Sequence, residues 1–123
     1  MTVLAIAIGG ALGAVSRFFL SNTVTNHYQF TLPVGTLGVN ILGSFALGVF
    51  YALFSVIDVP APLRLFLTAG FLGALTTFST YSIEAMSLFQ SGQYHSALLF
   101  IFLHNGLGIL MAVLGFGLVR LWV

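Results

Sequence analysis

Six hydroxyl-bearing side chains gather in the stretch TTFSTYS, residues 76–82, and the only glutamate of the chain, Glu84, follows two residues later. Hydroxyl groups donate hydrogen bonds to an anion without carrying a fixed positive charge. Phe78 and Tyr81, at i and i+3, share one side if the stretch is helical. The edges of aromatic rings are electropositive, although aromatic pairs at this spacing are usually packing. The stretch therefore suits a site that attracts a small anion and holds it weakly enough for conduction.

Other polar side chains stand alone in apolar stretches. Asn40, in GTLGVNILG, is expected to make an interhelical hydrogen bond, with donation to an anion as the alternative. Glu84 is a functional candidate, or else a hydrogen-bonded structural carboxylate. Arg17 lies near the end of its apolar stretch, so it either extends to the membrane surface or forms an electropositive vestibule. His104, in FLHNGLG, is either a packed ring or a donor beside a pore.

The composition places these residues in a membrane. The chain has 123 residues, 59% hydrophobic and 4% charged, with no Lys and no Cys, whereas soluble domains carry about 25% charged residues. An integral membrane protein with lipid around it is therefore predicted. The sequence contains no run of basic residues, so a nucleic-acid partner is not predicted. No nucleophile–base arrangement, phosphate loop or zinc-type His spacing indicates an enzyme.

Three polar stretches, at residues 22–31, 58–62 and 90–95, separate four apolar segments. The segments lie near residues 3–21, 33–55, 62–90 and 96–121. Each approaches or exceeds the roughly 20 helical residues that cross a bilayer, and none alternates as barrel strands do. The sequence predicts one all-α transmembrane domain of four helices over residues 1–123, with its N-terminus mature as written.

The third segment is too long for one straight span. As a single helix it would measure roughly 43 Å, against about 30 Å of hydrocarbon. It either tilts or breaks near GALTTFST, as the helices of some transporters do. Gly70 and Gly73 precede the hydroxyl cluster, and a break needs polar partners for its backbone. We therefore predict that the third span is broken mid-membrane.

Small residues and sparse charge bear on assembly. Gly9/Gly13, Ala69/Gly73 and Gly70/Ala74 have the spacing that lets helices approach closely, most simply within one bundle. Four helices leave little interior for the polar groups, which indicates an oligomer. Arg17 is predicted on one side of the membrane, and Arg64 and Arg120 on the side of the termini. This weak bias favours insertion in both orientations.

Three motifs, in order, carry a resemblance to a known family. GGALGAVSR, GTLGVNILGSFALG and GFLGALTTFSTYSIE make the chain similar, over essentially its whole length, to the small bacterial fluoride channels of the Fluc family. The resemblance implies an antiparallel, dual-topology homodimer with two fluoride pores along the subunit interfaces. It implies passive fluoride export across the bacterial inner membrane, which protects against fluoride toxicity. It also implies a structural sodium ion on the backbone carbonyls of Gly73 and Thr76.

The same resemblance implies which residues serve the pore. Arg17 falls near the aqueous vestibule, and the span-four polar track falls at His104 and Gly108. Tyr81 stands where the family commonly has Phe, and Ala74 stands where Gly is frequent. The residues assigned to the fluoride pore are Phe78, Tyr81, Asn40, Ser79, Thr80, Thr36 and Glu84.

Two other functions remain open from the sequence. A proton-coupled small multidrug transporter is also compact and four-spanning, but it would need a carboxylate in an early span, and the first two spans have none. A structural membrane subunit would leave the hydroxyl cluster unexplained.

Overall fold

The computed structural model describes residues 1–27 and 31–122. Four helical segments are long and apolar enough to cross a membrane: Thr2–Thr25, Val34–Leu53, Ala61–Gln90 and Tyr94–Arg120. The part of the chain that the structure describes contains helices and no strand. The prediction of an all-α protein with four spans is therefore confirmed. The predictions for the polar stretch 22–31 and for a domain over 1–123 lie partly outside the described residues.

The third span consists of several pieces, whereas the other three spans are single helices. These are α1 (Thr2–His27), α2 (Val34–Leu53) and α6 (Tyr94–Arg120). The third span consists of α3 (Ala61–Leu65), the π-helical turn η1 (Phe66–Leu72), α4 (Gly73–Leu75) and α5 (Phe78–Gln90).

The first helix is longer than predicted, because α1 continues past residue 21 to His27. The first turn of α2 packs against this added part of α1. A Cβ placed on Gly35 would lie 2.5 Å from both the Ser21 carbonyl oxygen and Thr25 Oγ1. The polar stretch is thus in tertiary contact with α2, which local composition does not reveal.

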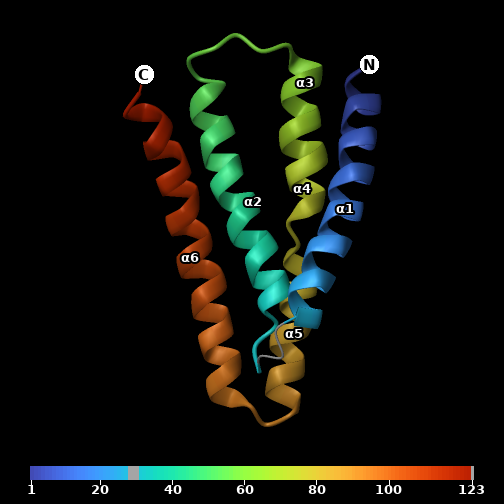
Figure 1. Cartoon of the computed structure of the whole chain (residues 1–123), viewed down its shortest axis with the longest axis vertical. Coiled ribbons are helices and arrows are strands. Elements are labelled where there is room, and N and C mark those ends of the chain that lie inside the picture. The colour runs from blue at the N-terminus through green and yellow to red at the C-terminus, as the bar shows by residue number, and fades with distance from the viewer. Residues whose placement is uncertain (28–30, 123) are drawn as a thin grey trace.

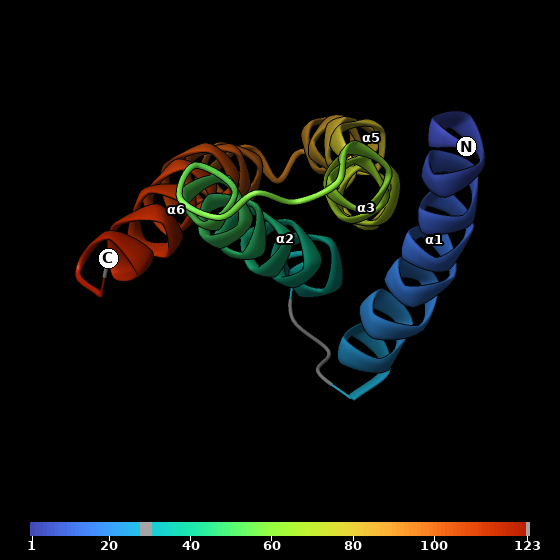
Figure 2. The same cartoon turned by 90° about the horizontal axis from the view of Figure 1, so that it is seen from above.

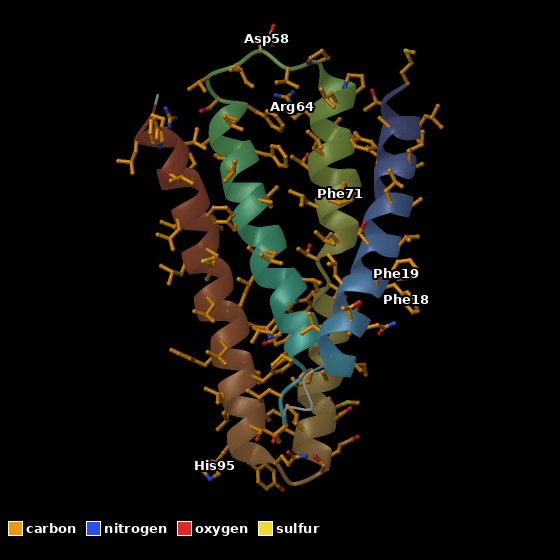
Figure 3. All side chains as sticks on the ribbon, in the orientation of Figure 1. Phe18, Phe19, Asp58, Arg64, Phe71 and His95 are labelled. Atoms are coloured by element: carbon orange, nitrogen blue, oxygen red, sulfur yellow. The ribbon has the colours of Figure 1, made fainter. Side chains whose placement is uncertain are left out.

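The four spans alternate in direction, and both termini lie at the same end of the bundle (Figure 1). Seen from above, α2 lies beside α6, and α1 lies beside the first half of the third span (Figure 2). Asp58 and Arg64 lie at the end that carries the termini, and His95 lies at the opposite end (Figure 3). Arg64 is therefore on the side that the sequence predicted.

The third span breaks at Thr76 and Thr77. Both residues are extended, with φ −79° and ψ 153° at Thr76 and φ −147° and ψ 115° at Thr77. A new helix starts at Phe78, and Thr77 caps it by accepting a hydrogen bond from the Thr80 backbone N–H at 3.2 Å. Such a cap satisfies one of the free donors at a helix start. The predicted mid-membrane break is confirmed.

Glycines bring the helix backbones into direct contact. A Cβ on Gly9 would lie 2.5 Å from the Phe66 carbonyl oxygen, and a Cβ on Gly13 would collide with the Phe71 carbonyl. A Cβ on Gly70 would lie 2.9 Å from the Ile6 carbonyl oxygen. These contacts hold α1 against η1, and they confirm close packing within one bundle. A Cβ on Gly73 would make only an ordinary contact, 3.5 Å from the Thr68 carbonyl oxygen of the same span.

Side-chain packing joins the second half of the third span to α6. Phe100 is fully buried at the centre of this contact. Deeply buried hydrophobic side chains are few in the described part of the chain, and much of the bundle surface is apolar. Phe18 and Phe19, for example, point away from the bundle (Figure 3), as expected for a protein surrounded by lipid. The cluster between α5 and α6 consists of Tyr81, Ala85, Leu88, Ala97 and Phe100.

Candidate functional site

Asn40 of α2 holds the break in place. Its Nδ2 donates to the Thr77 carbonyl oxygen at 3.0 Å, and its Oδ1 accepts from the Thr77 backbone N–H at 2.7 Å. One planar amide thus pairs both backbone groups of an extended residue that has left the helix. This is the interhelical hydrogen bonding expected of a lone amide in an apolar span. The second hydrogen of Nδ2 makes no hydrogen bond to the described residues and is available as a donor.

The break also releases two backbone carbonyls. In a continuous helix the Thr77 N–H would donate to the Gly73 carbonyl, and the Thr80 N–H to the Thr76 carbonyl. Here the Thr77 N–H donates to Asn40 Oδ1 instead, and the Thr80 N–H donates to Thr77 Oγ1. Gly73 and Thr76, the two residues assigned to sodium, therefore lose the donors that a helix would give their carbonyl oxygens.

A cavity of about 290 Å³, which we call the break cavity, lies beside the break at Thr76 and Thr77. It brings together three of the predicted pore residues, Asn40, Phe78 and Tyr81. His104 and Gly108, assigned to the span-four polar track, also line it. The residues that define it are Asn40, Gly43, Ser44, Leu47, Thr68, Leu72, Gly73, Thr76, Thr77, Phe78, Tyr81, His104, Asn105 and Gly108.

The two predicted pore rings differ in exposure. Their centroids lie 5.5 Å apart, so the i, i+3 spacing does place them on one side. Tyr81 is only 9% exposed, stacked on His104 at 4.4 Å and 5.7 Å from Phe100. Phe78 is 77% exposed in the single chain. Tyr81 is thus held by packing within the chain, whereas most of the Phe78 ring is exposed.

Glu84 is tied to α2 by one hydrogen bond. Thr36 Oγ1 donates to Glu84 Oε1 at 2.7 Å, and Thr36 is buried. The second oxygen, Oε2, is buried and has no partner among the described residues. Glu84 is not among the residues that line the break cavity. The Thr36–Glu84 pair therefore lies outside the lining of the break cavity.

A second cavity of about 310 Å³, the Arg17 cavity, is lined by three of the other polar candidates. It includes Arg17, Thr36 and Thr80, and Thr77 lines both cavities. Ser79 lines neither; its Oγ lies 3.3 Å from Thr77 Oγ1. The Arg17 cavity is defined by Ala14, Arg17, Phe18, Ser21, Asn22, Thr36, Val39, Thr77 and Thr80.

The sequence analysis missed three polar residues of the break cavity, Ser44, Thr68 and Asn105. Asn105 is the most consequential, because its Nδ2 donates to the Tyr81 hydroxyl at 3.1 Å. A signal was present: Asn105 is a lone amide in an apolar span, as Asn40 is. Its partner could not be foreseen, since the α5–α6 contact that joins the two residues is tertiary.

Fold and site together define a class of protein. The chain is a multi-pass membrane protein with a broken spanning helix, and polar groups line cavities at the break. Irregular backbone at membrane depth is typical of proteins that move ions or small solutes.

Comparison with known proteins identifies the family. The family described as "CrcB-like protein, Camphor Resistance (CrcB)" matches residues 4–116, and the chain belongs to it.

Several relatives are similar along nearly their whole length. A protein of Aquifex aeolicus is 44% identical over 93% of this chain and 93% of its own length. One from Pyrococcus furiosus is 48% identical over 94% and 93%, and one from Campylobacter fetus is 44% identical over 97% and 94%. Each of these relatives is named "Fluoride-specific ion channel FluC".

Proposed function

We propose that the chain is a fluoride-specific ion channel. The observation that carries this conclusion is identity of 44–48% to proteins of that name over more than nine tenths of the chain. These relatives are named as channels and not as enzymes. Membership of this family also favours a channel over the multidrug transporter and the structural subunit.

The chemistry of the break suits a small anion. The break cavity offers uncharged donors and a ring edge: the free N–H of Asn40, the hydroxyl of Tyr81 and the exposed ring of Phe78. Such groups replace part of an anion's hydration shell without a fixed cation that would trap it. Arg17, in the other cavity, supplies a positive charge that raises the anion concentration nearby. Ser79, Thr80, Thr36 and Glu84 complete the proposed pore set.

A second copy of the chain is proposed to cover the break cavity. The cavity is open, and its polar lining together with the exposed Phe78 ring would otherwise meet lipid. Polar groups exposed to hydrocarbon are costly. An antiparallel partner, made possible by the weak Arg bias, would bring two such faces together as a homodimer with dual topology.

A sodium ion is proposed at the centre of that dimer. Sodium is a hard cation that takes oxygen ligands, and the Gly73 and Thr76 carbonyls have lost their helical donors. Two carbonyls from each of two subunits would face one ion. The bound ion would neutralise the carbonyl dipoles where the helix is interrupted. Among the described residues no group of three or more His, Cys, Asp or Glu offers a competing metal site.

The proposed location is the bacterial inner membrane. Hydrogen fluoride enters a cell as a neutral acid and ionises inside. A membrane potential that is negative inside then drives the anion outward through a passive channel. Export of this kind would protect the cell against fluoride toxicity.

The function is tested with purified protein in liposomes loaded with fluoride or chloride. A potassium ionophore relieves the charge build-up, and an ion-selective electrode records the efflux. We expect passive fluoride efflux with chloride retained. Equal efflux of the two halides would contradict selectivity, and efflux that requires a pH gradient would indicate a proton-coupled transporter.

Dual topology is tested separately with reporter fusions at the C-terminus. We expect activity on both sides of the membrane, and a single added or removed loop charge should tip the ratio strongly. One-sided labelling of the native sequence would contradict the antiparallel dimer.

A further inference from the structure

We infer that Asn105 is a positioning residue that orients the Tyr81 hydroxyl so that its hydrogen is offered to fluoride in the break cavity. The inference rests on the proposed function and concerns how this chain binds the ion. Both residues line the break cavity, and Asn105 Nδ2 lies 3.1 Å from the Tyr81 oxygen.

The direction of this hydrogen bond is fixed by a third group. Asn105 Nδ2 also donates to the Ile101 carbonyl oxygen at 2.8 Å. A carbonyl oxygen only accepts, so the amide atom that faces it must be the nitrogen. The same nitrogen faces Tyr81, and the Tyr81 oxygen must therefore accept. Because the Asn105 amide is held by a carbonyl of its own helix, the hydrogen bond can run only from Asn105 to Tyr81.

The Tyr81 hydroxyl consequently keeps its own hydrogen. That hydrogen has no acceptor among the described residues. The ring cannot turn freely to find one, because it is 9% exposed and stacked on His104 at 4.4 Å. The remaining freedom is rotation of the O–H about its bond to the ring. With one lone pair engaged by Asn105, an anion in the cavity is the acceptor that this donor can reach.

The arrangement adds a directed O–H donor to a cavity that Phe78 also lines, and the two ring centroids lie 5.5 Å apart. Fluoride is a compact acceptor with concentrated charge, and hydrogen bonds to charged acceptors are stronger than neutral ones. The pair should therefore lower the fluoride concentration at which flux is half-saturated. Maximal flux should change less, because the ring edges and the Asn40 donor remain.

The test is a double-mutant cycle on fluoride flux measured across a range of fluoride concentrations. Tyr81→Phe removes the hydroxyl, Asn105→Leu removes the orienting amide, and the double variant removes both. We expect Tyr81→Phe to raise the half-saturating fluoride concentration about tenfold, the effect of losing one such hydrogen bond. Asn105→Leu should raise it severalfold in the native background and should add nothing in the Tyr81→Phe background.

The control is His95→Leu, which removes an exposed polar ring from the same helix at a position outside the break cavity. It should leave the half-saturating concentration unchanged. Asn105→Ala replaces the Leu variant if the latter does not reconstitute. Equal effects of the Asn105 substitution in both backgrounds would show a structural role only and overturn the inference. No effect in the native background would also overturn it. Absence of fluoride flux in the native protein would instead refute the proposed function.

Discussion

The two halves of the broken span are held in different ways. The first half packs backbone against backbone, with Gly9 and Gly13 of α1 touching the Phe66 and Phe71 carbonyls of η1. The second half packs side chain against side chain, with Tyr81 and Phe100 meeting between α5 and α6. The first kind of contact leaves no space for a ligand, and the second leaves space at its polar end, where the break cavity opens.

Because of this difference, we expect the first half of the third span to determine mainly the stability of the fold, and the break to determine mainly conduction. Glycine contacts fix where the first half ends, while the Asn40 amide and the Thr77 cap hold the extended residues that follow. Substitutions in the first region should mainly unfold the protein. Substitutions at the break should mainly change the path of the ion.

The largest effect on stability is expected from Gly13→Ala. The new Cβ would meet the Phe71 carbonyl, which as backbone cannot move aside easily, and overpacking of this kind costs roughly 1–3 kcal/mol. The matched control is Gly10→Ala in the same helix, where a Cβ meets nothing within 4 Å. It should be neutral, or stabilising by up to about 1 kcal/mol, because Ala favours helix. Melting temperatures of the two purified variants decide this, and equal values would contradict the packing argument.

Among substitutions that leave the first half of the third span unchanged, Asn40→Leu is expected to have the largest effect on fluoride flux. Loss of the amide leaves the Thr77 N–H and C=O without hydrogen-bond partners. Each buried group left unsatisfied lowers the free energy of unfolding by roughly 1–3 kcal/mol. The break should shift, so fluoride flux should fall greatly, with a lower melting temperature but a retained fold. Asn40→Asp keeps the acceptor for the Thr77 N–H and removes the donor to the carbonyl. Full flux in the Leu variant would show that the ion path requires neither the Asn40 donor nor its hydrogen bonds to Thr77.

A smaller effect is expected from Thr36→Val. The substitution keeps the shape but removes the hydrogen bond to Glu84 Oε1, so that neither carboxylate oxygen has a partner in the described residues. Stability should fall by roughly 1–3 kcal/mol, and flux should fall modestly. Thr36→Ser retains the hydroxyl and serves as the control. A Ser variant as impaired as the Val variant would show that the methyl group, and not the hydrogen bond, matters.

The smallest effect is expected from Arg17→Gln. A charge beside the Arg17 cavity concentrates anions from a distance, and salt screens that attraction. Flux should fall severalfold or less at low ionic strength, and the difference should vanish near 1 M salt, where the screening length is about 3 Å. Arg17→Lys should behave as the native protein. A deficit that persists at high salt would show that Arg17 acts by direct contact.

The sequence predicted the four spans and the break well, because both depend on local properties. Apolar length determines the spans, and the excess length of residues 62–90 together with the hydroxyl cluster locates the break near Thr76. The end of α1 was predicted too early: the helix continues into polar residues, where Ser21 and Thr25 contact Gly35 of α2.

The site was predicted in part. Asn40, Phe78 and Tyr81 do meet in one cavity, but the sequence could not show that Tyr81 is buried while Phe78 is exposed. That contrast arises from the packing of α5 on α6. The partner of Asn105 was hidden for the same reason, because the residues lie 24 positions apart.

Conduction at the break is tested most directly by Phe78→Ile, with fluoride flux per amount of folded protein and melting temperature measured on the same preparation. Phe78 is 77% exposed in the single chain, and Ile keeps an apolar side chain but deletes the electropositive ring edge. We predict a sharp fall in flux per amount of folded protein with little change in melting temperature. Unchanged flux per amount of folded protein with a lowered melting temperature would show that the ring serves only packing and would contradict its role in the fluoride path.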